Sequence, residues 1–298
     1  MTKLNAWLSA ARLRTLPLSV SGIIVGGALA ASNNGFNLHI FILALLTTIG
    51  FQVLSNFAND YGDGVKGTDN EDRIGPERAL QSGLISPSEM KKAIIITTGI
   101  TLVIAITLIY ISFGTASLNY FLIFLLLGIA SIVAAIKYTV GKNAYGYSGY
   151  GDIFVFVFFG LVGVLGSYFL FIQNLNFNLV LPAITIGLLS VTVLNLNNMR
   201  DIESDAKAGK RTLVVKIGAS SAKIYHFVII VIAILSSIGY SILNKTTSPI
   251  NFLYTIAFIP LIFHLIKVSK TKDSKDFDPE LKKIALTTFV FAILFSFS

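Results

Sequence analysis

The segment NFANDYGDGVKGTDNEDRIGPERALQSG, residues 56–83, places a cluster of acidic side chains next to an apolar stretch. It holds six of the fifteen Asp and Glu residues of the chain. The residues before it, LHIFILALLTTIGFQVLS from Leu38 to Ser55, contain no Asp, Glu, Lys or Arg. An apolar run of this kind approaches the roughly 20 residues that a helix needs to cross a bilayer. The junction therefore predicts a membrane helix whose polar end carries carboxylates.

The composition of the whole chain agrees with a membrane protein. Over 298 residues, 54% are hydrophobic and 13% are charged, and the mean hydropathy is +0.76. These values leave too little polar surface to cover a soluble globule. Cysteine is absent, which excludes disulfides and thiolate metal sites. The first apolar run lacks a small-residue cleavage site and many others follow it, so we interpret it as a retained span rather than a signal peptide.

Apolar runs near the length of a membrane span recur along the chain. We predict an all-α, polytopic membrane protein in which residues 1–298 form one domain with nine transmembrane helices. The predicted spans are residues 15–31, 38–58, 93–113, 117–136, 153–173, 177–199, 224–243, 249–266 and 284–297.

The connections between these spans alternate in charge. One set, with the N-terminal segment, holds 22 of the 23 Lys and Arg residues and all fifteen acids, whereas the other set holds only Lys245. The positive-inside rule therefore predicts a cytoplasmic N-terminus and an outer C-terminus in the cell inner (cytoplasmic) membrane. Because the net charge of +8 lies in these loops, we expect membrane lipid, and no nucleic acid, as a partner. The sequence predicts no particular oligomeric state.

One polar pattern occurs at the inner ends of two spans. Asn59 and Asp63 follow the second span, and Asn197, Asp201 and Asp205 repeat the four-residue spacing at the sixth. Residues four apart share one face of a helix. The repetition predicts two pseudo-repeated halves around a central cavity, with carboxylate-rich loops at 59–92 and 200–223.

Carboxylate and amide oxygens grouped in this way favour Mg²⁺. Asp60, Asp69, Glu71 and Asp72 add to the first loop. A single acidic loop can be merely a solvated surface, but two loops with matched spacing favour a functional site because charge near a membrane is costly. His39, His226 and His264 are scattered over different span ends, so we expect packing or interfacial roles for them and no zinc site.

Basic and aromatic residues lie near these acids. Lys66 is in the first loop, and Arg200, Lys210 and Arg211 are in the second. Such cations suit a phosphate leaving group, although each alone is also a common topology determinant. Tyr138 begins a middle loop with three further tyrosines, for which an interfacial role is the simpler interpretation; for Tyr138 we expect a π face toward a carbocation or an aromatic substrate.

The chain resembles the UbiA-type intramembrane aromatic prenyltransferases over almost its whole length. The residues that carry the resemblance are the two loops and the segments RLRTLPLSVSGIIVG, NDYGDGVKGTDNEDRIGPERALQSGLIS and YGYSGYGDIFVFVFFG. The resemblance implies nine transmembrane helices and two Asp-rich cytoplasmic loops that bind an isoprenyl diphosphate through Mg²⁺.

The family's site residues can be placed on this sequence by motif. The first Asn-x-x-x-Asp-x-x-x-Asp pattern falls on Asn59 and Asp63, but its third position is Gly67, so that Asp60 or Asp69 would supply the missing ligand. The second pattern is complete. The resemblance further implies metal binding by Asn59, Asp60, Asp63, Asp69, Asn197, Asp201 and Asp205. Through the family's Tyr-x-x-x-Lys pattern at Tyr138 and Lys142, and the cations after the second motif, it implies diphosphate binding by Lys142, Lys210 and Arg211. From their place among the acids we predict diphosphate binding by Lys66 and Arg200 as well, and we predict catalytic roles for Asp63, Asp201 and Tyr138.

The first-loop segment is most similar to the branch of the family that prenylates 1,4-dihydroxy-2-naphthoate. This implies transfer of a polyprenyl group from polyprenyl diphosphate to that acid, with loss of CO₂ and diphosphate, to give demethylmenaquinone. A sister enzyme using 4-hydroxybenzoate or another aromatic acceptor stays open. A cation-coupled transporter is an alternative of a different class, although transporters place their sites near the midplane and these acids lie at one face.

Overall fold

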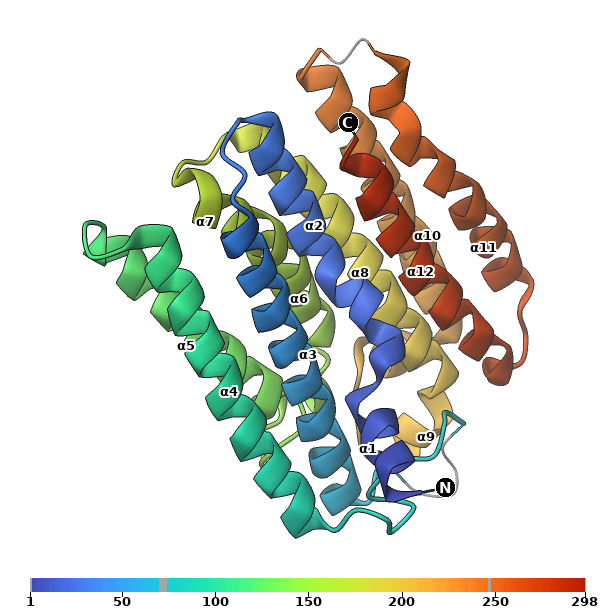
Figure 1. Ribbon diagram of the computed structural model, residues 1–298. Helices are drawn as coiled ribbons and strands as arrows, with labels where there is room; N and C mark the ends of the chain where they lie inside the picture. Colours follow the sequence, from blue (N-terminus) through green and yellow to red (C-terminus); the bar gives the residue numbers. More distant parts are fainter. Residues whose placement is uncertain (1, 70–73, 246–247, 298) are drawn as a thin grey trace.

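The computed structural model describes residues 2–69, 74–245 and 248–297, and in this part of the chain all regular structure is helical. The long helices lie side by side in a bundle (Figure 1). The elements are α1 (Lys3–Ala11), η1 (Leu13–Thr15), α2 (Leu16–Ser32), α3 (Leu38–Lys66), α4 (Pro87–Phe113), α5 (Leu118–Lys137), η2 (Tyr145–Ser148), α6 (Gly151–Val155), η3 (Phe156–Gly166), α7 (Ser167–Ile172), η4 (Phe177–Leu179), α8 (Val180–Arg200), α9 (Ile202–Lys207), α10 (Leu213–Leu243), η5 (Pro249–Ala257), α11 (Phe258–Lys270), η6 (Ser274–Phe277) and α12 (Asp278–Phe295).

Eight helical segments of the described chain are long and apolar enough to cross a membrane, so the chain is a multi-pass membrane protein. Eight of the nine predicted spans correspond to these segments, so the count of nine is not confirmed. The ninth predicted span corresponds to α12, which begins before the predicted residue 284 with Asp278, Glu280, Lys282 and Lys283 and is therefore more polar. In Figure 1, α12 nevertheless runs alongside α2 and α8.

Asp60 and Asp63 lie on a helix, as the shared face of Asn59 and Asp63 implied, although the sequence analysis assigned them to the loop 59–92; Asp69 follows the helix. Helix α3 continues beyond the predicted end at residue 58 as far as Lys66, so that Asp60 and Asp63 occupy its last turns. Gly67 ends the helix in the left-handed conformation, with φ of 73°, which glycine adopts without steric cost. The position at which the first motif lacks its third acid therefore serves as the helix cap. We refer to the end of the bundle that carries Asp63 and Asp201 as the motif end.

The fifth span packs unusually closely against its neighbours. Its central part, η3, is a π-helix of eleven residues, a conformation often found at functional sites. A Cβ atom on Gly160 of η3 would lie 2.6 Å from the carbonyl oxygen of Ala183 and 2.7 Å from the Cα of Gly187, both on α8. Glycine thus allows the backbones of η3 and α8 to pack directly against each other. Both helices line the central cavity, so this contact fixes the position of its wall.

We predict that Gly160→Ala lowers the stability of the protein because the contact involves backbone atoms that cannot turn aside. Overpacking of this kind costs about 1–3 kcal/mol. Gly99→Ala on α4 is the matched control, since nothing lies within 4 Å of its added Cβ. Thermal unfolding in detergent should show a lower midpoint for Gly160→Ala only. Equal midpoints for the two variants would contradict this packing.

Candidate functional site

A cavity of about 780 Å³ lies between the two halves of the bundle. Helices α2, α3, α5, α8 and α12 and the π-helix η3 all contribute lining residues. Both motifs face it, through Asn59, Asp63 and Asp69 from the first and Asn197, Asp201 and Asp205 from the second. Away from the motif end the lining becomes apolar, with residues such as Ile23, Ala105 and Leu170. The volume and mixed lining are typical of a small-molecule site.

The first motif is held by the middle loop. The hydroxyl of Tyr147 donates a hydrogen bond of 2.7 Å to Asp63 Oδ1 and also contacts the Thr68 hydroxyl. Thr139 Oγ1 lies 3.3 Å from Asn59 Oδ1. A Cβ on Gly62 would lie 2.6 Å from that same Thr139 Oγ1, so a larger residue at this position would push the middle loop away from α3.

The structure distinguishes between the two candidates for the third position of the first motif. Asp69 lines the cavity, two residues beyond the Gly67 cap, and lies 3.8 Å from the Arg78 guanidinium. Asp60 is 1% exposed, does not line the cavity, and accepts a hydrogen bond of 3.3 Å from the Ala79 amide. The geometry favours Asp69. Glu71 and Asp72 lie outside the described residues.

The second motif is organised by a buried arginine. Arg200 is 1% exposed and forms two hydrogen bonds to the carboxylate of Asp201, of 2.8 and 2.6 Å. Its Nη2 also donates to Asn197 Oδ1 at 2.9 Å, and Nη1 pairs with Asp278 at the start of α12 at 2.5 Å. Bidentate pairing of this type fixes geometry as well as charge. Arg200 therefore orients two predicted ligands, while its own guanidinium is occupied by carboxylates and does not line the cavity.

Lys210 connects the two motifs. Its ammonium lies 3.8 Å from Asp63 and 3.5 Å from Asp205, and the residue is 8% exposed. Burial lowers the pKa of Lys210, but the charges of Asp63 and Asp205 outweigh burial and raise it, so the side chain stays cationic. Burial raises the pKa of Asp205 to about 6, with Lys210 acting in the opposite direction.

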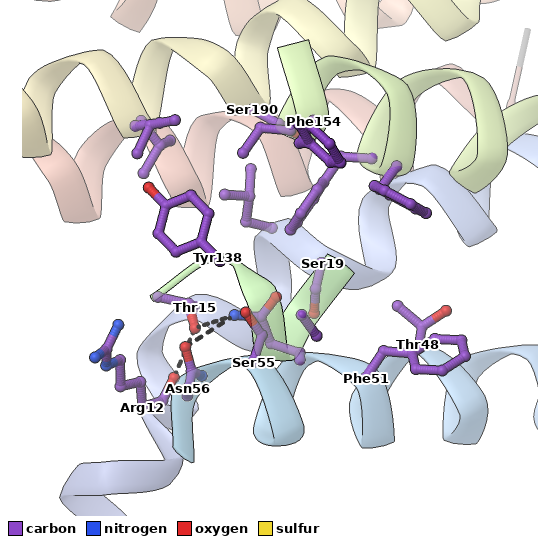
Figure 2. Close-up of a pocket in the computed structure, with 18 of the residues that line it drawn as sticks. Arg12, Thr15, Ser19, Thr48, Phe51, Ser55, Asn56, Tyr138, Phe154 and Ser190 are labelled. Atoms are coloured by element: carbon purple, nitrogen blue, oxygen red, sulfur yellow. Dashed lines mark hydrogen bonds between the residues drawn. The ribbon is translucent and has the colours of Figure 1, made fainter. Parts of the chain in front are cut away.

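An aromatic series follows the cavity wall from the middle loop into the fifth span. Tyr138 packs edge-to-face on Tyr145 with centroids 5.3 Å apart, Tyr145 stacks on Phe154 at 3.8 Å, and Phe154 stacks on Phe158 at 6.2 Å. All four line the cavity, and Phe154 lies across it from Phe51 (Figure 2). Burial raises the pKa of Tyr138 to about 12, so its phenol is neutral. The series offers π faces beside the acids.

A polar group on η1 and α3 forms the opposite wall (Figure 2). Gln52 lies 3.3 Å from both Thr15 Oγ1 and Asn56 Oδ1, and Asn56 Nδ2 donates to the carbonyl of Ala11 at 2.9 Å. Arg12, at the junction of α1 and η1, has a left-handed backbone with φ of 50° and also lines the cavity. A non-glycine residue in this conformation is uncommon and often lies at a functional site.

Four of the five predicted diphosphate-binding cations do not line the cavity, including the buried Arg200. Lys142 and Arg211 are exposed and do not line it. Lys66 is turned toward the middle loop, where its Nζ donates to the Thr139 carbonyl at 2.7 Å and lies 3.9 Å from the centroid of the Tyr147 ring. Of the five cations predicted for this role, Lys210 alone lines the cavity.

Several residues of the site were not anticipated from the sequence, among them Tyr147 and Asp278. Tyr147 was grouped with the interfacial tyrosines, and Asp278 lies outside both motifs. Asp278 is separated from Arg200 by 78 positions, so no local spacing indicates the contact. For Tyr147, the glycines on both sides, Gly146 and Gly149, were the available signal, because they allow the loop to pack closely on Tyr138 and on Lys216 of α10.

The oxygen atoms at the motif end fit a divalent cation shared with a ligand. Asp205 Oδ2 is buried and has no hydrogen-bond partner among the described residues. Within the same part of the chain, no group of three or more His, Cys, Asp or Glu side chains could hold a metal ion by itself. This arrangement suits Mg²⁺, which is usually held by one or two carboxylates together with substrate phosphates.

We predict that Arg200→Ala is strongly destabilising because it leaves Asp201 and Asp278 without their shared partner. Removing one member of a buried ion pair costs about 3–5 kcal/mol. The control is Arg211→Ala, since Arg211 is exposed and surface substitutions usually change stability by less than about 0.5 kcal/mol. The thermal midpoint in detergent should fall clearly for Arg200→Ala and little for the control. A similar small change in both would argue against the buried network.

Comparison with known proteins identifies the relatives of this chain. The model of the UbiA prenyltransferase family matches residues 19–291. The chain is 44% identical to the 1,4-dihydroxy-2-naphthoate octaprenyltransferase of Haemophilus influenzae, over 99% of this chain and 95% of that protein. It is 49% identical to the Escherichia coli protein of the same name, over 76% of this chain and 73% of that protein.

Solved structures share the fold. A UbiA homolog from Archaeoglobus fulgidus bound to GPP and Mg²⁺ superposes with a TM-score of 0.68 at 17% identity, covering 98% of this chain and 99% of that one. A UbiA homolog from Aeropyrum pernix gives a TM-score of 0.67 at 17% identity, covering 94% and 98%. By its fold, its match to the family model and the identity of its relatives, this chain belongs to the UbiA prenyltransferase family.

Proposed function

We propose that this protein transfers a polyprenyl group from polyprenyl diphosphate to 1,4-dihydroxy-2-naphthoate, releasing diphosphate and CO₂ to give the prenylated 1,4-diol, demethylmenaquinol, which a separate two-electron oxidation would convert to demethylmenaquinone. The observation that carries the proposal is the position of Lys210 between Asp63 and Asp205, which joins the two motifs into one site. The acceptor is taken from the names of the bacterial relatives. Family membership favours prenyl transfer over cation-coupled transport.

The diphosphate would bind at the motif end. Mg²⁺, held by oxygens of Asn59, Asp63, Asp69, Asn197, Asp201 and Asp205, would supply positive charge to the departing diphosphate. Lys210 provides a further fixed cation at the same place. Charges that are already in position where negative charge develops lower a barrier without reorganisation. Arg200 would serve by holding Asp201 and Asn197 in place, rather than by touching the diphosphate as its place among the acids predicted.

The allylic carbon and the acceptor ring would lie beside the aromatic series. When the C–O bond to diphosphate breaks, positive charge develops on the allylic carbon, and the π faces of Tyr138 and Phe154 would stabilise it. The electron-rich ring of the acceptor then forms the new C–C bond. The apolar part of the cavity would hold the isoprenyl tail and keep water from the cation.

We further propose the orientation that the loop charges favour. The motif end would face the cytoplasm in the cell inner membrane, and the far end of α12 would face outward. In Figure 1, α1 and the carboxyl end of α12 lie at opposite ends of the bundle, as this orientation requires. The soluble acceptor would then enter from the cytoplasm, and the lipid donor from the bilayer.

We predict that Asp201→Ala largely abolishes release of diphosphate from polyprenyl diphosphate in isolated membranes. Losing one preorganised electrostatic group in an active site costs about 10²- to 10³-fold in rate. Asp276→Ala is the control, because Asp276 is an exposed carboxylate that does not line the cavity. Full activity in Asp201→Ala, at equal protein levels, would exclude the assigned role of the second motif.

We also predict that Tyr147→Phe lowers the rate of diphosphate release, but less than Asp201→Ala does, because it removes the hydrogen bond to Asp63 and keeps the ring. A hydrogen bond to a charged group contributes about 1.5–3 kcal/mol, which corresponds to a loss of about ten-fold or more. Tyr150→Phe, in the same loop and 55% exposed, is the matched control. Steady-state rates at saturating Mg²⁺ would test this, and equal rates for the two variants would count against a role for Tyr147.

A further inference from the structure

A chain of hydrogen bonds crosses the interior of the second half of the bundle. His226 Nδ1 lies 2.9 Å from Asn195 Oδ1, and the Nε2 atoms of His226 and His264 lie 2.8 Å apart. His264 Nδ1 lies 2.7 Å from Glu280 Oε2, and Lys283 donates to the second oxygen of Glu280. Four of the residues that form these hydrogen bonds, Asn195, His226, His264 and Glu280, are no more than 3% exposed. All four ring nitrogens of His226 and His264 have a partner, so these two histidines, unlike His39, are not scattered as expected.

This buried chain joins four helices close to the motif end. Asn195 belongs to α8, His226 to α10, His264 to α11 and Glu280 to α12. On α8, Asn195 precedes the motif residue Asn197 by two positions. On α12, Glu280 faces the histidines, whereas Asp278 and Lys283, within one turn of it, line the cavity. These buried hydrogen bonds therefore hold the first turn of α12 on the side away from the cavity, while other residues of that turn line the cavity.

Two parallel connections thus run between α8 and α12. One is the buried chain, and the other is the contact from Asp278 through Arg200 to Asp201. Ionisable side chains within membrane spans are costly and seldom serve packing alone. A buried polar contact in the same half, between Ser241 and Tyr254 at 2.7 Å, joins α10 to η5 and does not involve the first turn of α12, so it serves as the structural comparison.

We infer that His226, His264 and Glu280 are positioning residues, which hold the first turn of α12 so that Asp278 keeps Arg200, and through it Asp201, in the geometry that binds the metal and diphosphate. This inference rests on the proposed function. It assigns to α12, outside both motifs, control over the affinity of the second motif for an anionic ligand.

The test measures Mg²⁺-dependent binding of an unreactive thiolo analogue of geranyl diphosphate to the purified protein in detergent. His264→Leu should weaken binding about ten-fold, a coupling typical of residues in one network. The affinity of His264→Gln, which retains a hydrogen-bonding side chain, should lie between those of His264→Leu and the wild type. Tyr254→Phe, the matched control, removes a buried hydrogen bond and should lower the thermal midpoint without changing the affinity.

A double-mutant cycle separates positioning from general destabilisation. If the buried chain acts through Asp278, then His264→Leu should weaken binding little further in an Asp278→Asn background. Additive losses, or unchanged affinity in His264→Leu, would overturn the inference. Glu280→Gln, which preserves side-chain volume, replaces His264→Leu in the cycle if the latter does not fold.

A second measurement is independent of the proposed function. Amide hydrogen exchange in residues 278–283 should be faster in His264→Leu than in Tyr254→Phe, because the first turn of α12 loses its anchor. If the wild-type protein binds no analogue, the proposed function fails and the exchange result alone decides the inference. Equal exchange in the two variants would overturn it.

Discussion

The site depends on one ammonium group that is shared by two carboxylates from different halves of the chain. Lys210 lies within 4 Å of Asp63 on α3 and of Asp205 on α9. Without a cation between them, two buried carboxylates at this separation would repel each other and favour separation of the halves. Other contacts orient the same groups, through Tyr147 on Asp63 and Arg200 on Asp201. The cavity therefore has a charged end built around a single lysine and an apolar end enclosed by helices.

Much of this arrangement could be predicted from the sequence. Apolar runs identified the spans, and the repeated Asn-x-x-x-Asp spacing indicated that α3 and α8 carry equivalent groups. The predicted ends of two helices, α3 and α12, were wrong, because both helices are longer than their apolar runs. Charged residues can extend a helix beyond the hydrocarbon, so that α3 ends at Lys66 rather than at the last apolar residue, and α12 begins at Asp278. Gly67, which seemed only a missing ligand, ends the helix and allows Asp69 to face the cavity.

The remaining parts depend on contacts between distant segments, which no local spacing reveals. Asp278 reaches Arg200 across 78 positions, and Tyr147 reaches Asp63 across 84. His226 and His264 looked like isolated packing residues because each lies on a different helix, yet they form one buried chain with Glu280. In contrast, Lys142 matched a family motif by position but is exposed and outside the cavity. A motif therefore indicates which segments meet, and the fold decides which side chains face the ligand.

The most direct measurement of the central claim is the mass of the product made by the purified protein. The assay contains octaprenyl diphosphate, Mg²⁺ and equal concentrations of 1,4-dihydroxy-2-naphthoate and 4-hydroxybenzoate. A site built from both motifs around this cavity predicts one lipid product, the octaprenylated naphthoate that has lost CO₂, and none when Mg²⁺ is chelated. Formation of the hydroxybenzoate product alone would contradict the assigned acceptor, and the absence of any prenylated product would contradict the account as a whole.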